Sequence, residues 1–229
     1  MRDKLLILDM DNTVLRSGID FRRMCAVVHE IFDQEGLGRY KQRTTARSMV
    51  AYEQSPDYDP ALAARLWQAI EAVEAEGLRR AVAEPGAAAA LAYLSQQAVV
   101  TILTNNTDQA AQENMERLGM AGHCDLIVGR DSVPFLKPAP EGFLQIMAAY
   151  PEIRPSHTLA VGDAANDAHG AQAAAIGFAA YNNSRDEDWE GWGIRPLLRL
   201  TAWNRQSCDA LLQGLPWRAA GESRGRENG

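Results

Sequence analysis

The stretch that decides the fold is Leu5-Leu-Ile-Leu-Asp-Met-Asp-Asn-Thr13, in which a short apolar run ends at a pair of aspartates. The run Leu5 to Leu8 is typical of a strand that is buried on both faces. Residues two apart in an extended segment point the same way, so Asp9 and Asp11 present two carboxylates to one spot. Two like charges so close need a cation or a shared proton. An isolated pair of this kind is more often a solvated loop with an Asx turn, so the interpretation depends on the rest of the chain.

Further apolar runs follow the first, and helical stretches separate most of them. Strands that alternate with helices predict an α/β fold with a doubly wound, mostly parallel sheet, in which sites form at the carboxyl ends of strands. The predicted strands after the first are Val99 to Leu103, Leu126 to Val128, Thr158 to Val161 and Gly177 to Tyr181. The predicted helices are Pro85 to Gln97, Asp108 to Leu118, Pro140 to Tyr150 and Asp167 to Ala175.

The interval from Arg16 to Glu84 breaks this alternation, because it shows helical periodicity and no convincing strand. Apolar residues recur at helical spacing from Met24 to Phe32 and again from Leu62 to Val73. We therefore expect an all-helical domain, residues 16–84, inserted into a discontinuous α/β core of residues 1–15 and 85–215. The polar end of the chain, residues 216–229, is expected to be a flexible tail.

The other predicted strands also end in polar side chains. Thr104-Asn-Asn106 follows the second strand, Lys137 precedes a predicted helix, and Gly162-Asp-Ala-Ala-Asn-Asp167 follows the fourth strand. Each has an ordinary explanation by itself, as a strand-end hydroxyl, a surface charge or a helix cap. Together, four carboxylates, one hydroxyl and one ammonium at the strand ends of one sheet indicate a site. Oxygen ligands of this kind suit Mg²⁺, while the ammonium and loop amides suit phosphate oxygens, so the set predicts phosphoryl transfer.

These residues, in this order, resemble the four motifs of the haloacid dehalogenase superfamily, and the resemblance covers about residues 1–200. It implies a Rossmann-like core. The predicted helical insertion is similar to the cap of the phosphoglycolate phosphatase and β-phosphoglucomutase branch. Many members have Gly where this chain has Asn12, but Asn also tolerates unusual backbone angles. The motifs are Asp9 to Thr13, Thr104, Lys137, and Gly162 to Asp167.

The resemblance implies a Mg²⁺-dependent phosphatase that hydrolyses a small organic phosphate monoester, phosphoglycolate-like or a sugar phosphate, through an aspartyl phosphate. Asp9 is then the nucleophile, and Asp11 is the general acid and base. Mg²⁺ is bound by the carboxylates of Asp9 and Asp163 and by the backbone carbonyl of Asp11. The remaining implied roles are phosphate binding by Thr104, Asn105 and Lys137, and orientation of Lys137 or of a water on the metal by Asp167.

Other activities share parts of this residue set. A sugar phosphate mutase uses the same core but returns the phosphoryl group to a bound intermediate. Phosphonate hydrolysis in this superfamily needs a cap lysine, for which only Lys41 is available, and nothing around it marks a buried amine. A receiver domain, which is not an enzyme, also accepts a phosphoryl group on an aspartate. Its acceptor would follow the third strand, however, and it lacks the helical insertion, so the phosphatase is the leading prediction.

Composition narrows the range of partners. The 229 residues contain 23 Lys and Arg against 30 Asp and Glu, and the resulting net charge of −7 lacks the basic excess of a nucleic-acid-binding protein. The three cysteines form no CxxC pair, which fits a reducing cytoplasm. No apolar run reaches the roughly 18 residues of a membrane span. We expect a cytoplasmic monomer or homodimer that acts on a small phosphorylated molecule.

The predicted insertion contains a run of cations with no acid between them, formed by Arg39, Lys41, Arg43 and Arg47. In a helix, the three arginines would share one face. A solvated face paired with acidic neighbours is the ordinary explanation, and contact with an anionic leaving group is the alternative. Three tryptophans late in the chain are expected to serve packing or a partner surface rather than substrate binding; they are Trp189, Trp192 and Trp203.

Overall fold

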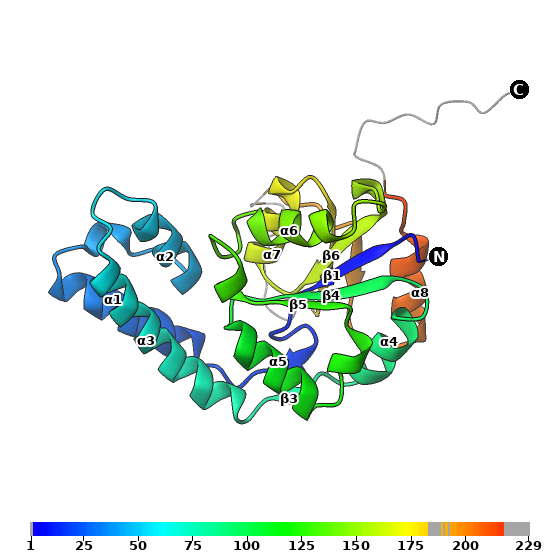
Figure 1. The fold of residues 1–229 in the computed structure, drawn as a ribbon, viewed down its shortest axis with the longest axis horizontal. Helices are drawn as coiled ribbons and strands as arrows, with labels where there is room; N and C mark the ends of the chain where they lie inside the picture. The colour runs from blue at the N-terminus through cyan, green and yellow to red at the C-terminus, as the bar shows by residue number, and fades with distance from the viewer. Residues whose placement is uncertain (1, 183–188, 190, 192, 218–229) are drawn as a thin grey trace, which may run out of the picture.

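The computed structural model describes residues 2–182, 189, 191 and 193–217, and it contains a parallel sheet with helices on both faces (Figure 1). Within these residues, six strands lie in the order β5-β4-β1-β6-β7-β8, and every neighbouring pair is parallel. The predicted α/β class with a doubly wound sheet is confirmed. The strands are β1 (Leu5–Leu8), β4 (Val99–Leu103), β5 (Leu126–Val128), β6 (Thr158–Gly162), β7 (Gly177–Tyr181) and β8 (Leu198–Leu200).

Strand β1 lies inside the sheet, between β4 and β6. Leu6 and Leu8 belong to the apolar core on one face, while Leu5 and Ile7 belong to the core on the other, as the alternation of a strand requires. Burial on both faces is the reason that the strand is a continuous apolar run. Because the three neighbouring strands run parallel, the polar residues that follow them meet at one edge of the sheet.

Helices cover both faces of this sheet. One core includes apolar residues of α4, α5 and α8, and the other includes residues of α6 and α7. As predicted, α5 stops before Gly119, whose φ of +71° is a left-handed angle that glycine adopts at little cost. The helices are α4 (Ala87–Leu94), α5 (Asp108–Arg117), α6 (Glu141–Ala149), α7 (Ala165–Ala173) and α8 (Arg205–Gln213), with short 3₁₀ helices η2 (Ala121–His123), η3 (Arg130–Ser132) and η4 (Pro155–His157).

The elements β8 and α8 extend the fold beyond those predicted. Strand β8 has only three residues and lies at the edge of the sheet, so it carries no readable periodicity. After it, the Trp203 indole donates a hydrogen bond to the backbone oxygen of Thr13 at 2.6 Å and stacks on the Tyr181 ring. This late segment therefore packs against the loop that follows β1.

The structure also shows what the late aromatic residues do. Trp189 is buried against the ring of Phe178, and Trp203 is buried as well, which confirms their packing role. Trp192 lies outside the described residues. At the beginning of the predicted tail, the Trp217 backbone N–H donates to the Ser156 carbonyl oxygen at 2.9 Å, while residues 218–229 lie outside the described residues.

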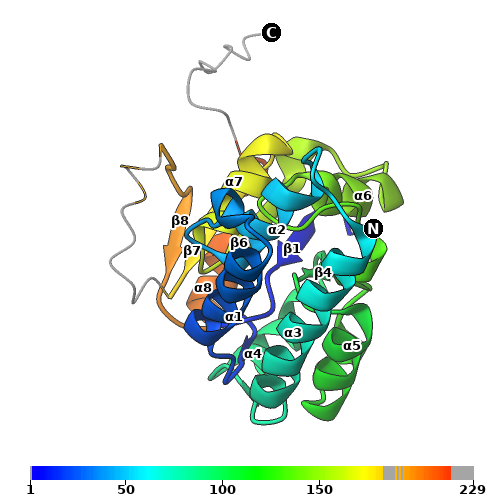
Figure 2. The same cartoon turned by 90° about the vertical axis from the view of Figure 1, so that its left-hand side faces the viewer.

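Between β1 and β4 the chain forms a helical insertion that lies beside the sheet (Figures 1 and 2). A two-stranded antiparallel sheet of β2 (Leu15–Arg16) and β3 (Val82–Ala83) joins it to the rest. The prediction of no strand in this interval is wrong, because two residues are too few to show alternation. The insertion consists of α1 (Phe21–Gln34), η1 (Gly38–Tyr40), α2 (Thr45–Glu53) and α3 (Pro60–Leu78).

The insertion has an apolar interior of its own. Val28 and Phe32 of α1 and Leu66 and Ile70 of α3 are buried, at the helical spacing that the sequence shows. Across the described part of the chain, no helix has the length and apolar character needed to cross a membrane.

Candidate active site

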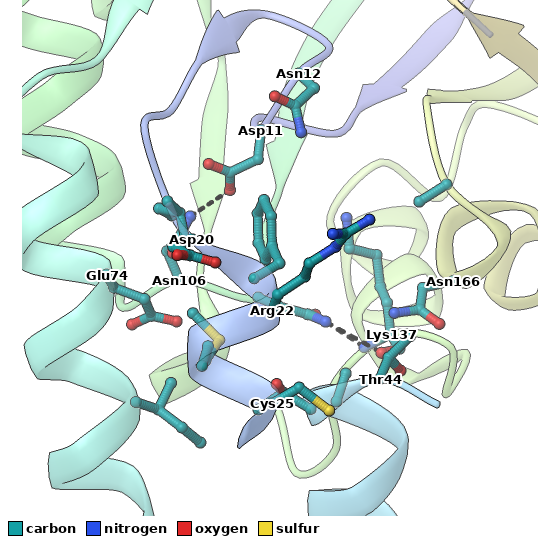
Figure 3. A pocket seen from close by; sticks show the side chains of 18 of the residues that line it. Asp11, Asn12, Asp20, Arg22, Cys25, Thr44, Glu74, Asn106, Lys137 and Asn166 are labelled. Carbon is teal, nitrogen blue, oxygen red and sulfur yellow. Dashed lines mark hydrogen bonds between the residues drawn. The ribbon is translucent and has the colours of Figure 1, made fainter. Parts of the chain in front are cut away.

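A cavity of about 930 Å³ lies where the carboxyl edge of the sheet faces the helical insertion (Figure 3). Its core wall follows β1, β4 and β6, together with the loop after β5. The opposite wall comes from α1, α3 and the start of α2. Of the residues predicted from the sequence, those in the wall are Asp9, Asp11, Arg43, Asn105, Lys137, Asp163 and Asp167.

Lys137 occupies the centre of the core wall, and its side chain is 5% exposed. Its Nζ donates to Asp9 Oδ1 at 2.6 Å, to Asp167 Oδ1 at 2.7 Å and to the Leu103 carbonyl oxygen at 2.7 Å. Burial by itself lowers the pKa of Lys137, but the charges of Asp167 and Asp9 outweigh it and raise the pKa above its ordinary value. The ammonium is therefore charged at any working pH and is held in one place.

Three carboxylates gather beside this ammonium. Oxygens of Asp9, Asp163 and Asp167 all lie within 4.8 Å of one another. Burial first, and then the charge of Asp167, raise the pKa of Asp9 well above its ordinary value. The glycine before Asp163 permits the cluster, because a Cβ on Gly162 would lie 2.4 Å from the Asp167 carboxyl group. Both oxygens of Asp167 have partners within the protein, since the second oxygen accepts from the Ala164 N–H at 3.2 Å.

Asp11 is hydrogen-bonded to residues that follow β4. Its Oδ2 accepts a hydrogen bond from the Asn106 side-chain amide (Figure 3). The same oxygen accepts one from Thr104 Oγ1 at 3.5 Å. Burial raises the pKa of Asp11, and hydrogen bonds from its neighbours oppose that rise only in part. The turn depends on Asn12, whose φ of +58° is the left-handed angle that Asn tolerates.

The loop after β4 is joined to the Lys137 loop by one side chain. Asn105 donates from Nδ2 to the Lys137 carbonyl oxygen at 3.1 Å and accepts at Oδ1 from the Lys137 N–H at 3.0 Å. Within the described residues, the backbone N–H of Asn105 donates no hydrogen bond to the protein. The sequence prediction gave Asn106 no role, although it lies in the Thr104-Asn-Asn106 segment that follows the strand. Its N–H donates to Thr104 Oγ1 at 3.2 Å.

The three arginines predicted in the insertion do not share a helical face, because α2 begins at Thr45, after Arg39 and Arg43. Arg43 lines the cavity. Arg39 lies outside the cavity and pairs with Asp57. Arg47 also lies outside it, near α7. Burial lowers the pKa of His169 on that helix, and the charge of Arg47 lowers it further. Sequence reasoning also missed Arg22, an α1 side chain that extends into the cavity (Figure 3).

The chain matches the family model of haloacid dehalogenase-like hydrolases over residues 4–175. It is 25% identical over 204 residues to the phosphoglycolate phosphatase of Pseudomonas putida, a match that covers 82% of this chain and 74% of that protein. It is 33% identical over 114 residues to the phosphoglycolate phosphatase of Rhodobacter capsulatus, where the match covers 49% of this chain and 48% of that protein.

Solved structures show the same fold. A haloacid dehalogenase-like hydrolase from Bacteroides fragilis superposes with a TM-score of 0.65 at 18% identity, covering 87% of this chain and 97% of that one. The hydrolase YfnB from Bacillus subtilis, solved with bound magnesium, superposes with a TM-score of 0.60 at 20% identity. The match covers 93% of this chain and 99% of that one.

The family match takes in all four motifs on which the sequence prediction rested, and the structure brings their residues to one edge of the sheet. Both the predicted resemblance and the predicted enzyme class are thereby confirmed. The chain belongs to the haloacid dehalogenase-like hydrolase family.

Proposed function

We propose that this protein is a Mg²⁺-dependent phosphatase that hydrolyses a small organic phosphate monoester through an aspartyl phosphate on Asp9. The observation that carries the proposal is the Lys137 ammonium, which is shared between Asp9 and Asp167 at 2.6 and 2.7 Å at the edge of a cavity. A cation fixed beside a carboxylate can hold a phosphoryl oxygen while that carboxylate attacks phosphorus.

The donor set fits a magnesium ion. The carboxylates of Asp9, Asp163 and Asp167 and the ammonium of Lys137 sum to a formal charge of −2, which a divalent cation balances. By resemblance to the family, Asp9, Asp163 and the backbone carbonyl of Asp11 would hold the ion, and Asp167, both of whose oxygens have partners, would orient Lys137. When bound, Mg²⁺ supplies positive charge that keeps Asp9 ionised despite its burial and that offsets the charge of an approaching phosphate.

In the first step, an Asp9 oxygen forms a bond to phosphorus as the bond from phosphorus to the leaving alkoxide breaks. Asp11 donates its proton to that alkoxide, a role that its burial favours because burial raises the pKa of the carboxyl group. In the second step, Asp11 takes a proton from water, the water oxygen attacks phosphorus, and Asp9 is released with inorganic phosphate. Throughout, Lys137, Thr104 and the N–H of Asn105 bind the phosphoryl oxygens.

We further propose that the chain divides into a catalytic core of residues 1–15 and 85–215 and a cap of residues 16–84. The walls of the cavity come from both, so the core performs the phosphoryl transfer and the cap contacts the rest of the substrate. The cavity suits a small ester, and the similar proteins named phosphoglycolate phosphatases support a substrate of that size, phosphoglycolate-like or a sugar phosphate.

The test is phosphate release from a panel of phosphorylated metabolites with Mg²⁺, comparing the wild type with Asp9→Asn. We expect the substitution to abolish turnover of every substrate, because an amide cannot form the covalent bond. Activity that survives in Asp9→Asn would overturn the nucleophile assignment. Isomer formation without phosphate release would identify a sugar phosphate mutase instead. The matched control is Asp33→Asn, which removes an exposed carboxylate from the insertion.

A further inference from the structure

One buried arginine connects the helical insertion to the core at a distance from the β2–β3 linker. Arg130 belongs to η3 in the core, and its side chain is 5% exposed. Its Nη1 donates to both carboxylate oxygens of Glu74 on α3, at 2.9 and 2.8 Å, and its Nη2 donates to Glu71 at 3.1 Å. The guanidinium carbon also lies 4.7 Å from the centre of the Trp67 ring. The three partners are spaced four and three residues apart, so they form one face of α3.

The same arginine holds the loop that follows β4. Its Nη1 also donates to the Asn105 carbonyl oxygen at 3.2 Å, and its backbone N–H donates to the Asn106 carbonyl oxygen at 2.8 Å. Asn105 in turn holds the backbone of Lys137 through its side chain. The partners of one guanidinium are therefore α3 on one side and the loop assigned to phosphate binding on the other.

A second arginine, Arg117, also joins the core to the insertion, but within the insertion it bonds only the end near the linker. Arg117 of α5 donates to the carbonyl oxygens of Leu78 and Ala81, at 3.4 and 2.9 Å, where α3 runs into the β3 linker. That contact lies beside the linker and has no bond to the phosphate-binding loop. Arg130 contacts α3 farther from the linker and does bond that loop, so movement of α3 away from the core would separate its charges.

Separating these charges is unfavourable while they remain buried. A buried guanidinium without its carboxylates is strongly unfavourable unless water reaches it, so the paired arrangement favours the docked position of the insertion. The carboxylates of Glu71 and Glu74 hold the Arg130 guanidinium in position, and the same guanidinium donates the hydrogen bond to the Asn105 carbonyl oxygen. We propose that Arg130 is a positioning residue that couples docking of the insertion to the geometry of the phosphate-binding loop. Only the phosphate readout of this proposal rests on the proposed function.

The test alters the α3 side of the contact and leaves the loop untouched. We expect Glu71→Gln/Glu74→Gln to release the insertion, which increases the radius of gyration in small-angle X-ray scattering. We also expect the Kd for inorganic phosphate, measured by calorimetry with Mg²⁺, to rise about fivefold or more. The measurements are made above pH 7, where Glu74 is ionised despite its raised pKa of about 7. Loss of that negative charge near the site would by itself strengthen phosphate binding, so weaker binding identifies the coupling. The matched control is Glu76→Gln, also on α3, which is expected to change neither quantity.

Two further variants separate the two contacts of Arg130. Arg130→Met removes both contacts and is expected to weaken phosphate binding at least as much as the double Gln variant. In Arg130→Met/Glu74→Leu an apolar pair replaces the ion pair, which restores the wild-type radius of gyration while phosphate binding stays weak, because the bond to Asn105 is still missing.

The proposal is overturned if the double Gln variant lowers the melting temperature but leaves both the radius of gyration and the phosphate Kd at wild-type values, since that is the behaviour of a structural ion pair. It is equally overturned if the radius of gyration rises while the phosphate Kd stays constant. Failure of the wild type to bind phosphate would count against the proposed phosphatase, and the scattering data would still decide the docking contact.

Discussion

The core and the insertion each contain a lysine–aspartate pair, and the two pairs differ in how far they are shielded from water. In the core, Lys137 is 5% exposed and donates to three oxygens within 2.7 Å. In the insertion, Lys41 is 34% exposed, and its carboxylate partner Asp33 is more exposed still. Both are lysine–aspartate pairs, but only the core pair is shielded from water. The Lys137 ammonium is therefore held in one place, whereas the Lys41 ammonium is screened by water and can change position.

The difference follows from burial rather than from residue type. An exposed ion pair contributes about 0–1 kcal/mol, because water screens it and the side chains lose entropy. Removing one partner of a buried pair costs about 3–5 kcal/mol, because the remaining charge is left unpaired. Substitution of the buried Lys137 should therefore affect both folding and chemistry, and substitution of the exposed Lys41 should affect neither strongly.

The most direct way to break the comparison is to substitute the two lysines in the same manner. We expect Lys137→Met to lower kcat/KM for an aryl phosphate by about 1,000-fold, because the ammonium that we propose binds the phosphoryl oxygens is lost. Lys41→Met should change it by less than about twofold. Turnover is measured per folded molecule, with the folded fraction taken from near-ultraviolet circular dichroism. Equal losses in the two variants would show that shielding from water does not decide the role of a lysine here.

How much could be predicted from the sequence follows the same division. The strands β1, β4, β5 and β7 match their predicted bounds, because central parallel strands are continuous apolar runs. The candidate site residues could be predicted because they come after these strands in the chain, and parallel strands all end at the same edge of the sheet. A short apolar run followed by polar residues is a local pattern, so the core wall of the cavity could be predicted from it.

The insertion and the connections to it depend on contacts between residues far apart in the chain. Arg39 pairs with Asp57 outside the cavity. Arg130 pairs with two carboxylates of α3 that lie more than 50 residues earlier in the chain. No local pattern marks either pairing. The same holds for β8, which is too short to show periodicity and depends on its neighbour β7 for its place in the sheet.

A second test asks whether a divalent cation binds at the carboxylate cluster of the core rather than elsewhere on the protein. The cluster of Asp9, Asp163 and Asp167 is formally −2 with Lys137 included, so Mg²⁺ should stabilise the folded protein. At a concentration 100 times its Kd, the gain is about 2.7 kcal/mol. For a chain of this length, that raises the melting temperature by roughly 5–10 °C. Differential scanning calorimetry measures the shift.

The matched variant is Asp163→Asn, in which the gain should disappear, and NaCl at equal ionic strength controls for screening. An undiminished shift in Asp163→Asn would place the ion elsewhere on the molecule. The chelator EDTA should return the wild type to its metal-free melting temperature.

A third test uses two carboxylates on α3. Burial raises the pKa of Glu74 from 4.5 to about 7, and the charge of Arg130 opposes this only in part. Between pH 4.5 and 7 the folded protein keeps a proton that the unfolded chain has lost, so this group's contribution to stability falls as the pH rises. The unfolding free energy of the wild type minus that of Glu74→Gln should fall by up to about 3 kcal/mol across this window.

The control for this test is Glu76, an exposed residue of the same helix. Hydrogen bonding and the charge of Arg23 lower the pKa of Glu76, so its contribution to stability should change in the opposite direction, being lost as the pH falls. Urea titrations of the wild type, Glu74→Gln and Glu76→Gln at a series of pH values measure both. A difference between wild type and Glu74→Gln that stays constant with pH would show that Glu74 titrates normally.

The smallest expected effect lies within the insertion, between two arginines that the sequence places in one run. Arg43 lines the cavity, whereas Arg39 pairs with Asp57 outside it. Arg43→Ala should raise KM about fivefold for a phosphate ester with a second anionic group, since one partly exposed charge pair contributes about 1 kcal/mol. For an aryl phosphate without that group, KM should stay within about twofold, and Arg39→Ala should affect neither substrate. If Arg43→Ala raises both KM values equally, the side chain supports the fold of the insertion rather than contacting the substrate, and discrimination must reside in other residues of that wall.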